Sequence, residues 1–146
     1  MIEIPPEAIL RCINDWCIIH FKDNCHTPEA PSHWYFTIPI NPGSLFTLCI
    51  VTSQAHTRLY YYEKSNPRAA QALVRLEADS FPFIKKESLI DCNKAELLSI
   101  EELINRVDQK IGLTREPQVI DTELRERIVK GILNSPLISA AIKKHF

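Results

Sequence analysis

The chain lacks three features that would point directly to a class of function: an excess of positive charge, paired cysteine motifs and a long apolar run. With 17 Lys and Arg against 18 Asp and Glu, the 146 residues carry a formal net charge of -1. No global positive field therefore attracts nucleic acid. The five cysteines form no C-x-x-C pair, which favours reduced thiols and a cytoplasmic protein. The apolar runs are too short to cross a bilayer, so we expect no membrane partner.

Length and periodicity predict a single α+β domain over residues 1–146. Pro5-Pro6-Glu7 suits the first turn of a helix, and the helical spacing of the apolar residues that follow predicts a helix over 5–20. A polar loop with two prolines follows over 22–32. Its Cys25-His26 pair has no second ligand pair at zinc-like spacing, so we predict no metal.

Two strand-like apolar runs follow, at 33–40 and 45–54. Asn41-Pro-Gly-Ser44 between them is turn chemistry and predicts an antiparallel hairpin. Further strands are predicted at 58–63, which is rich in aromatic residues, and at 88–92, while Ala69 to Leu76 fits either a short helix or the lead into a strand. Several short strands without long helices between them predict a small antiparallel sheet curled into a barrel over 33–98.

The C-terminal part, residues 99–146, changes to a helical pattern. Ser99 with Glu102 forms a capping box, and the apolar face that follows reaches Gly112, which is placed to end this helix. A second helix is predicted to begin near Asp121 and to be interrupted at Asn134-Ser-Pro136. A last short helix is predicted to end at Lys143-Lys144. We expect these helices to form an extension of the barrel.

Polar residues flank the predicted hairpin. His33 opens the first strand, and the second ends in Thr52, Ser53 and Gln54. Hydroxyl and amide groups at the exit of a buried strand lie on a sheet rim, where a ligand can meet them. The same residue types also begin turns, so a purely structural role remains open.

The stretch from His33 to about Leu98 resembles the small toxin domain of the PemK/MazF type, an SH3-like barrel. The resemblance lies in three parts: His33-Trp-Tyr-Phe-Thr-Ile-Pro, the Asn-Pro-Gly-Ser turn, and Leu48-Cys-Ile-Val-Thr-Ser-Gln54. A fourth part, Phe81-Pro-Phe-Ile-Lys-Lys-Glu-Ser-Leu-Ile-Asp-Cys-Asn93, is similar to the strand pair that leads to a polar residue on the active face. The chain fits a PemK-like subgroup with C-terminal helices.

This resemblance implies cleavage of single-stranded RNA without a metal or another cofactor. The RNA's own 2′-hydroxyl attacks the phosphorus and leaves a 2′,3′-cyclic phosphate. The threonine of the family falls on Thr52. Its arginine falls on His33, which can transfer protons near neutral pH but carries less permanent charge. A protein antitoxin and a second copy of the chain are the further partners that such a toxin would have.

The chemistry of this cleavage assigns roles to the remaining polar residues. His33 would transfer a proton, and the hydroxyls of Thr52 and Ser53 would contact phosphate oxygens. The expected RNA-binding residues are Gln54, Arg58, Lys85, Lys86 and Asn93.

Two other functions stay open on the sequence. The same barrel can be a catalytically silent binding module for nucleic acid or peptide, which the net charge and His33 favour. An enzyme with a cysteine nucleophile is a weaker alternative, because Cys92 lies next to Asp91 and has no basic partner in sequence.

Overall fold

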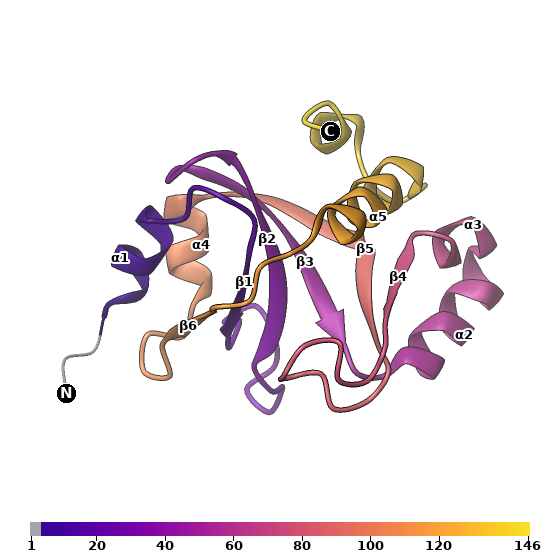
Figure 1. Cartoon of the computed structure of the whole chain (residues 1–146), viewed down its shortest axis with the longest axis horizontal. Coiled ribbons are helices and arrows are strands. Elements are labelled where there is room, and N and C mark those ends of the chain that lie inside the picture. The colour runs from indigo at the N-terminus through magenta and orange to yellow at the C-terminus, as the bar shows by residue number, and fades with distance from the viewer. Residues whose placement is uncertain (1–3) are drawn as a thin grey trace. The chain divides into compact units, whose positions relative to one another are not determined.

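One antiparallel sheet and several short helices make up residues 4–146, the part of the chain that the computed structural model describes (Figure 1). The strands follow the order β4-β5-β3-β2-β1-β6, and the sheet does not close on itself. The protein is of the predicted α+β class, but the barrel predicted over 33–98 is not confirmed, because the sheet is open. The strands are β1 (Cys17–Phe21), β2 (His33–Asn41), β3 (Leu45–Thr52), β4 (Leu73–Leu76), β5 (Ser88–Ser99) and β6 (Leu113–Glu116). The helices are α1 (Pro6–Arg11), α2 (Ala55–Ser65), α3 (Pro67–Ala70), α4 (Ile100–Arg106), α5 (Thr122–Asn134) and α6 (Ala140–Lys143).

The contacts within the chain define two units. The first unit comprises Met1–Leu48 with Leu97–Val119, and the second unit comprises Cys49–Glu96 with Ile120–Phe146.

In the first unit, β1 lies between two antiparallel neighbours. It pairs with β2, where Ile19 faces Tyr35, and with β6, where Ile19 faces Arg115. The predicted helix over 5–20 is wrong beyond Arg11, where α1 ends. The run Cys17-Ile-Ile-His-Phe21 is β-branched and aromatic, and its burial between two strands outweighs the helical spacing of its apolar residues.

The turn between β2 and β3 has the predicted chemistry. Ser44 N–H donates to the carbonyl of Asn41 at 3.0 Å, and Gly43 has φ +75°. That positive φ favours glycine. A Cβ at position 43 would also lie 3.2 Å from the carbonyl oxygen of Arg11, so glycine allows the turn to approach the end of α1.

The capping box that begins α4 is confirmed. The Ser99 hydroxyl accepts from Glu102 N–H, and the Glu102 carboxylate accepts from Ser99 N–H, both at 3.1 Å. The predicted helix end at Gly112 is wrong, because α4 ends at Arg106 and Val107 is already extended. Val107 forms a β-bridge with Asp23 instead, and the short strand β6, which was not predicted, follows Gly112.

In the second unit, the segment predicted as a strand over 58–63 is the helix α2. Ala55 and Tyr62, seven positions apart, are its buried residues, which is a helical and not an alternating pattern. The buried Tyr62 hydroxyl donates to Asp91 at 2.8 Å. The burial of Ala55 and Tyr62 and the hydrogen bond to Asp91 outweigh the strand preference of the tyrosines. The segment 69–76 contains both predicted alternatives, first the end of α3 and then β4, which pairs with β5.

The remaining helices of the second unit follow the predicted pattern. Asp121 caps α5 by accepting from Leu124 N–H at 2.8 Å, and α5 ends at Asn134, as predicted. The last helix, α6, is shorter than predicted and begins only at Ala140. No helix of residues 4–146 is both long and apolar enough to span a membrane.

Candidate histidine site

His33, the first residue of β2, faces a second histidine. The ring centroids of His26 and His33 lie 5.4 Å apart, and the planes meet at 83°. Both imidazoles are partly exposed, but the Nδ1 atom of each is buried without a hydrogen bond to any described residue. We call this pair, with Asp23 and Arg106, the histidine site.

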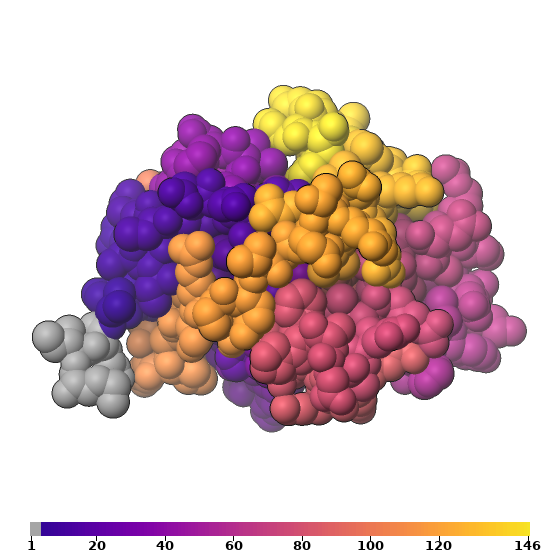
Figure 2. Space-filling view, in the orientation of Figure 1, coloured from indigo at the N-terminus to yellow at the C-terminus, as the bar shows by residue number. Residues whose placement is uncertain are grey.

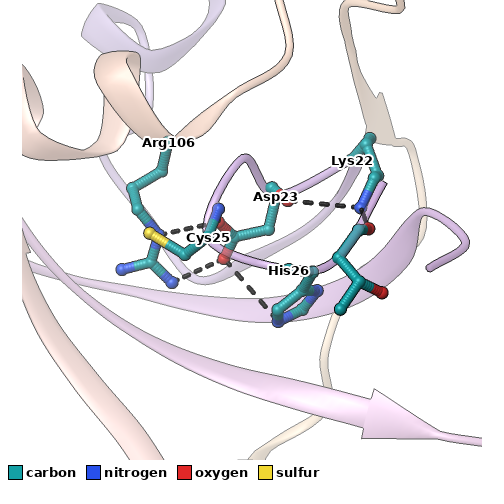
Figure 3. A network of polar contacts seen from close by, with 6 residues as sticks. Lys22, Asp23, Cys25, His26 and Arg106 are labelled. Atoms are coloured by element: carbon teal, nitrogen blue, oxygen red, sulfur yellow. Dashed lines mark hydrogen bonds and ion pairs between the residues drawn. The ribbon is translucent and has the colours of Figure 1, made fainter. Parts of the chain in front are cut away.

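Asp23 and Arg106 form the fixed part of the histidine site (Figure 3). The Asp23 side chain is fully buried, and the Arg106 guanidinium donates to its two carboxylate oxygens, with Nε at 2.8 Å from Oδ1. Such bidentate pairs fix orientation as well as charge. The Nε2 atom of His26 lies 3.9 Å from Oδ2 of the same carboxylate.

The loop that carries His26 is held by its own polar contacts. Buried Lys22 donates from Nζ to the carbonyl of Thr27 at 2.6 Å and to that of Asp23 at 3.4 Å. The amide of Asn24 donates to the carbonyls of Asn105 and Val107. His26 is therefore placed against His33 by a structured loop.

Burial and neighbouring charge set the protonation of the site. Burial lowers the pKa of the His33 imidazole, and His26 and Lys22 lower it further, while the Pro31 carbonyl opposes the shift. Burial raises the pKa of Asp23, but the hydrogen bonds from Arg106 and from Cys25 N–H outweigh it, so that pKa is lowered overall. At neutral pH the site thus combines a neutral His33 with an ionised Asp23.

This arrangement is suited to proton transfer. A neutral imidazole can accept a proton, and a second imidazole beside a carboxylate can supply one. Because the two rings are in contact, the protonation of one disfavours that of the other.

Metal binding has no support in this geometry. Among residues 4–146, no group of three or more His, Cys, Asp or Glu side chains is arranged to hold a metal ion.

The predicted residues at the exit of β3 lie in the second unit. Thr52 is the last residue of β3, and its Oγ1 accepts from Gln54 N–H at 3.2 Å, which is the geometry of a turn. Ser53 and Gln54 are exposed, and Gln54 precedes α2 without a capping hydrogen bond from its side chain.

The predicted RNA-binding residues of the second unit differ in their accessibility. Lys85 and Lys86 are exposed, and half-buried Arg58 lies on α2 with its guanidinium carbon 5.8 Å from the Tyr61 ring centroid. Asn93 is buried within β5. Its amide donates to the Ala69 carbonyl at 2.8 Å and accepts from the Ser135 hydroxyl at 2.7 Å. Both ends of the Asn93 side chain are thus engaged, so we leave it out of the RNA contacts proposed below.

The sequence interpretation missed three residues of the histidine site. His26 was considered only as a metal ligand beside Cys25, and Asp23 and Arg106 were not singled out. Asp23 and Arg106 are 83 positions apart in the sequence. No local sequence motif links a buried aspartate to an arginine so far along the chain. The ion pair between Asp23 and Arg106 was therefore visible only in the folded structure.

All five cysteines are free, and Cys49 and Cys92 are buried in the second unit. A hydrogen bond with Cys92, together with burial, raises the pKa of the Cys49 thiol well above its ordinary value. A thiol that resists ionisation inside the protein is a poor nucleophile.

Comparisons with known proteins leave the family open. No family model matches the chain, and neither a curated protein nor a solved structure matches it. The likeness to the PemK/MazF type therefore rests on the short motifs between His33 and Asn93.

Proposed function

We propose that the protein is a PemK/MazF-like endoribonuclease that cleaves single-stranded RNA without a metal, by attack of the 2′-hydroxyl on the adjacent phosphorus. The observation that carries this proposal is the contact between His33 and His26, of which the second lies beside a buried carboxylate. RNA cleavage of this kind needs a proton acceptor and a proton donor, and two histidines provide both.

The two histidines have different roles in the proposed reaction. Neutral His33 accepts the proton of the 2′-hydroxyl as this oxygen forms its bond to phosphorus. The bond between phosphorus and the 5′-oxygen breaks, and that leaving oxygen takes up a proton, for which His26 is the proposed donor. The products are a 2′,3′-cyclic phosphate and a 5′-hydroxyl. The lowered pKa of His33 supports its role as the base, because a neutral imidazole can accept a proton.

Positive charge near the reacting phosphate is the third requirement. The ammonium of Lys22 is held close enough to lower the pKa of His33, so its field acts in the first unit. Contacts from Thr52 and Ser53 to phosphate, and from Gln54, Arg58, Lys85 and Lys86 to RNA, remain predictions. Each can be tested by a single substitution.

The rest of the family resemblance belongs to the same proposal. It includes the SH3-like barrel, a protein antitoxin, a second copy of the chain and a cytoplasmic location. The five free thiols support the cytoplasmic location, and the sheet is antiparallel but open.

The proposal is tested with two matched oligonucleotides in the presence of a chelator. We expect the protein to cleave single-stranded RNA and to leave the same sequence intact when every 2′-hydroxyl carries a methyl group. A protein that binds RNA and never cuts it, over a broad set of sequences, would be the binding module instead. Cleavage of the methylated strand would contradict the proposed nucleophile.

A further inference from the structure

Helix α2 exposes two aromatic rings to solvent. Tyr60 is 62% exposed and Tyr61 56% exposed, which is unusual for side chains with so much apolar surface. In the space-filling view the segment of α2 and α3 lies at the surface of the second unit (Figure 2). A helix turns by about 100° per residue, so Tyr60 and Tyr61 project in directions about 100° apart, and both directions lead to solvent.

The fold of the second unit leaves both rings largely in solvent. Their neighbour Tyr62 is the tyrosine that anchors α2, because it is buried and donates to Asp91. The Tyr61 ring meets the Tyr62 ring edge to face, with centroids 5.4 Å apart, and Tyr61 nevertheless stays 56% exposed.

A cation lies over each of the exposed rings. The guanidinium carbon of Arg58 is 5.8 Å from the centroid of Tyr61, and Nζ of Lys64 is 5.4 Å from that of Tyr60. These are i, i+3 and i, i+4 pairs on one helix. The surface thus presents aromatic faces with positive charge at their margins, which is the combination that single-stranded nucleic acid uses.

The local charge of this surface differs from that of the whole chain. Residues 55–70 contain Arg58, Lys64 and Arg68 against one acid, Glu63, so the segment carries +3 − 1 = +2 with histidine neutral. The whole chain carries -1. A positive segment on an otherwise acidic protein is complementary to a phosphate backbone.

We infer that Tyr60 and Tyr61 form a stacking platform for the bases of single-stranded RNA, with Arg58 and Lys64 contacting its phosphates. This inference rests on the proposed function for RNA as the substrate class. It assigns α2 a role in substrate binding, which is separate from the proton transfer at His33 and His26.

The experiment measures binding of a fluorescently labelled, fully 2′-O-methylated oligonucleotide by anisotropy, because this strand cannot be cleaved by 2′-hydroxyl attack. In Tyr60→Leu/Tyr61→Leu the dissociation constant should rise about tenfold for each ring removed. Tyr60→Phe/Tyr61→Phe keeps both aromatic faces and should bind within about twofold of the wild type.

A charge control separates the platform from general attraction. Lys64→Gln should weaken binding several-fold and reduce its salt dependence, whereas Lys144→Gln removes another exposed cation, just after α6, and should change neither. Equal effects of the two lysine substitutions, or wild-type affinity in the leucine variant, would overturn the inference.

Further outcomes distinguish this inference from the proposed function. If the leucine variant binds like the wild type while RNA is still cleaved, the platform is wrong and the nuclease stands. If the leucine substitutions abolish binding and the wild type never cleaves RNA, the platform stands and the nuclease is wrong. If the wild type binds no oligonucleotide but self-associates, and the leucine variant does not, α2 is an interface between copies and the inference fails.

Discussion

The imidazole rings of His26 and His33 meet edge to face, with their centroids 5.4 Å apart. One ring lies on a loop that is tied to Asp23 and Arg106, and the other begins β2. Since both belong to the first unit, the fold of that unit alone brings the two titratable groups into contact. Burial and then the His26 ring lower the pKa of His33, which gives the site a measurable signature apart from catalysis.

Removal of the proposed base should abolish activity without unfolding the protein. His33→Gln should lower the rate of RNA cleavage by at least about a hundredfold. Because His33 is partly exposed, the melting temperature should hardly change. His145→Gln, at an exposed position near the C-terminus, is the matched control and should retain full activity. Cleavage at the wild-type rate in His33→Gln would remove His33 from the mechanism.

The pKa of His33 should depend on His26. Burial and then His26 lower this pKa, so His26→Gln should raise it, and the protonation of His33 can be followed by NMR. In the wild type, the cleavage rate should rise with pH through the lowered pKa of His33, since the neutral ring is the base. In His26→Gln this rise should move to higher pH. An unchanged His33 titration would show that the two rings are not coupled.

The buried ion pair should be important for stability. Arg106→Leu leaves the fully buried Asp23 carboxylate without its main partner, and the free energy of unfolding should fall by about 3 kcal/mol in urea denaturation. The pKa of Asp23 is lowered by folding, so the pair stabilises above the unfolded pKa and the effect is lost as pH falls through the folded pKa. The loss in Arg106→Leu should therefore be seen at neutral pH and shrink in acid.

A surface ion pair provides the control for Arg106→Leu. Arg75 and Glu87 form a bidentate pair in solvent, with both distances at 2.9 Å. Arg75→Leu should leave stability unchanged within error, because solvent screens this pair. Equal effects of the two substitutions would contradict the role of burial.

Packing of α5 in the second unit depends on the absence of a side chain at Gly131. A Cβ there would lie 2.8 Å from Cys92 Sγ and 3.0 Å from the Ala72 carbonyl oxygen. Gly131→Ala should therefore destabilise by about 1–3 kcal/mol, although alanine favours helices. In a Cys92→Ala background the sulfur is gone, and the same substitution should cost less. A double-mutant cycle without coupling would show that the sulfur is not the obstacle.

Local signals predicted the parts of the fold that depend on local chemistry. The turn at Gly43, the capping box of Ser99 and the cap of Asp121 are each defined by residues within a few positions, and all three are present. The hydrophobic spacing was ambiguous before Phe21, where a short apolar run fits a helix and a strand equally well. The segment Cys17–Phe21 forms a strand because it pairs with β2 on one side and with β6 on the other.

The missed elements and site residues depend on contacts that are distant in sequence. Strand β6 has four residues with one buried side chain, so its sequence carries no alternation to detect. Tyr60 to Tyr62 suggested a strand by composition, and the contact of Tyr62 with Asp91 fixed a helix instead. For the candidate site, His33 was proposed from its place before a strand, whereas its partner His26 became visible only in the folded chain.

The most direct test of the proposed ribonuclease is the chemistry of its product ends. Single-stranded RNA is incubated with the protein in excess chelator, and the fragments are analysed by mass spectrometry. We predict fragments that end in a 2′,3′-cyclic phosphate and begin with a 5′-hydroxyl, and none of them with His33→Gln. Fragments that begin with a 5′-phosphate, or cleavage that stops when the chelator is added, would contradict the account.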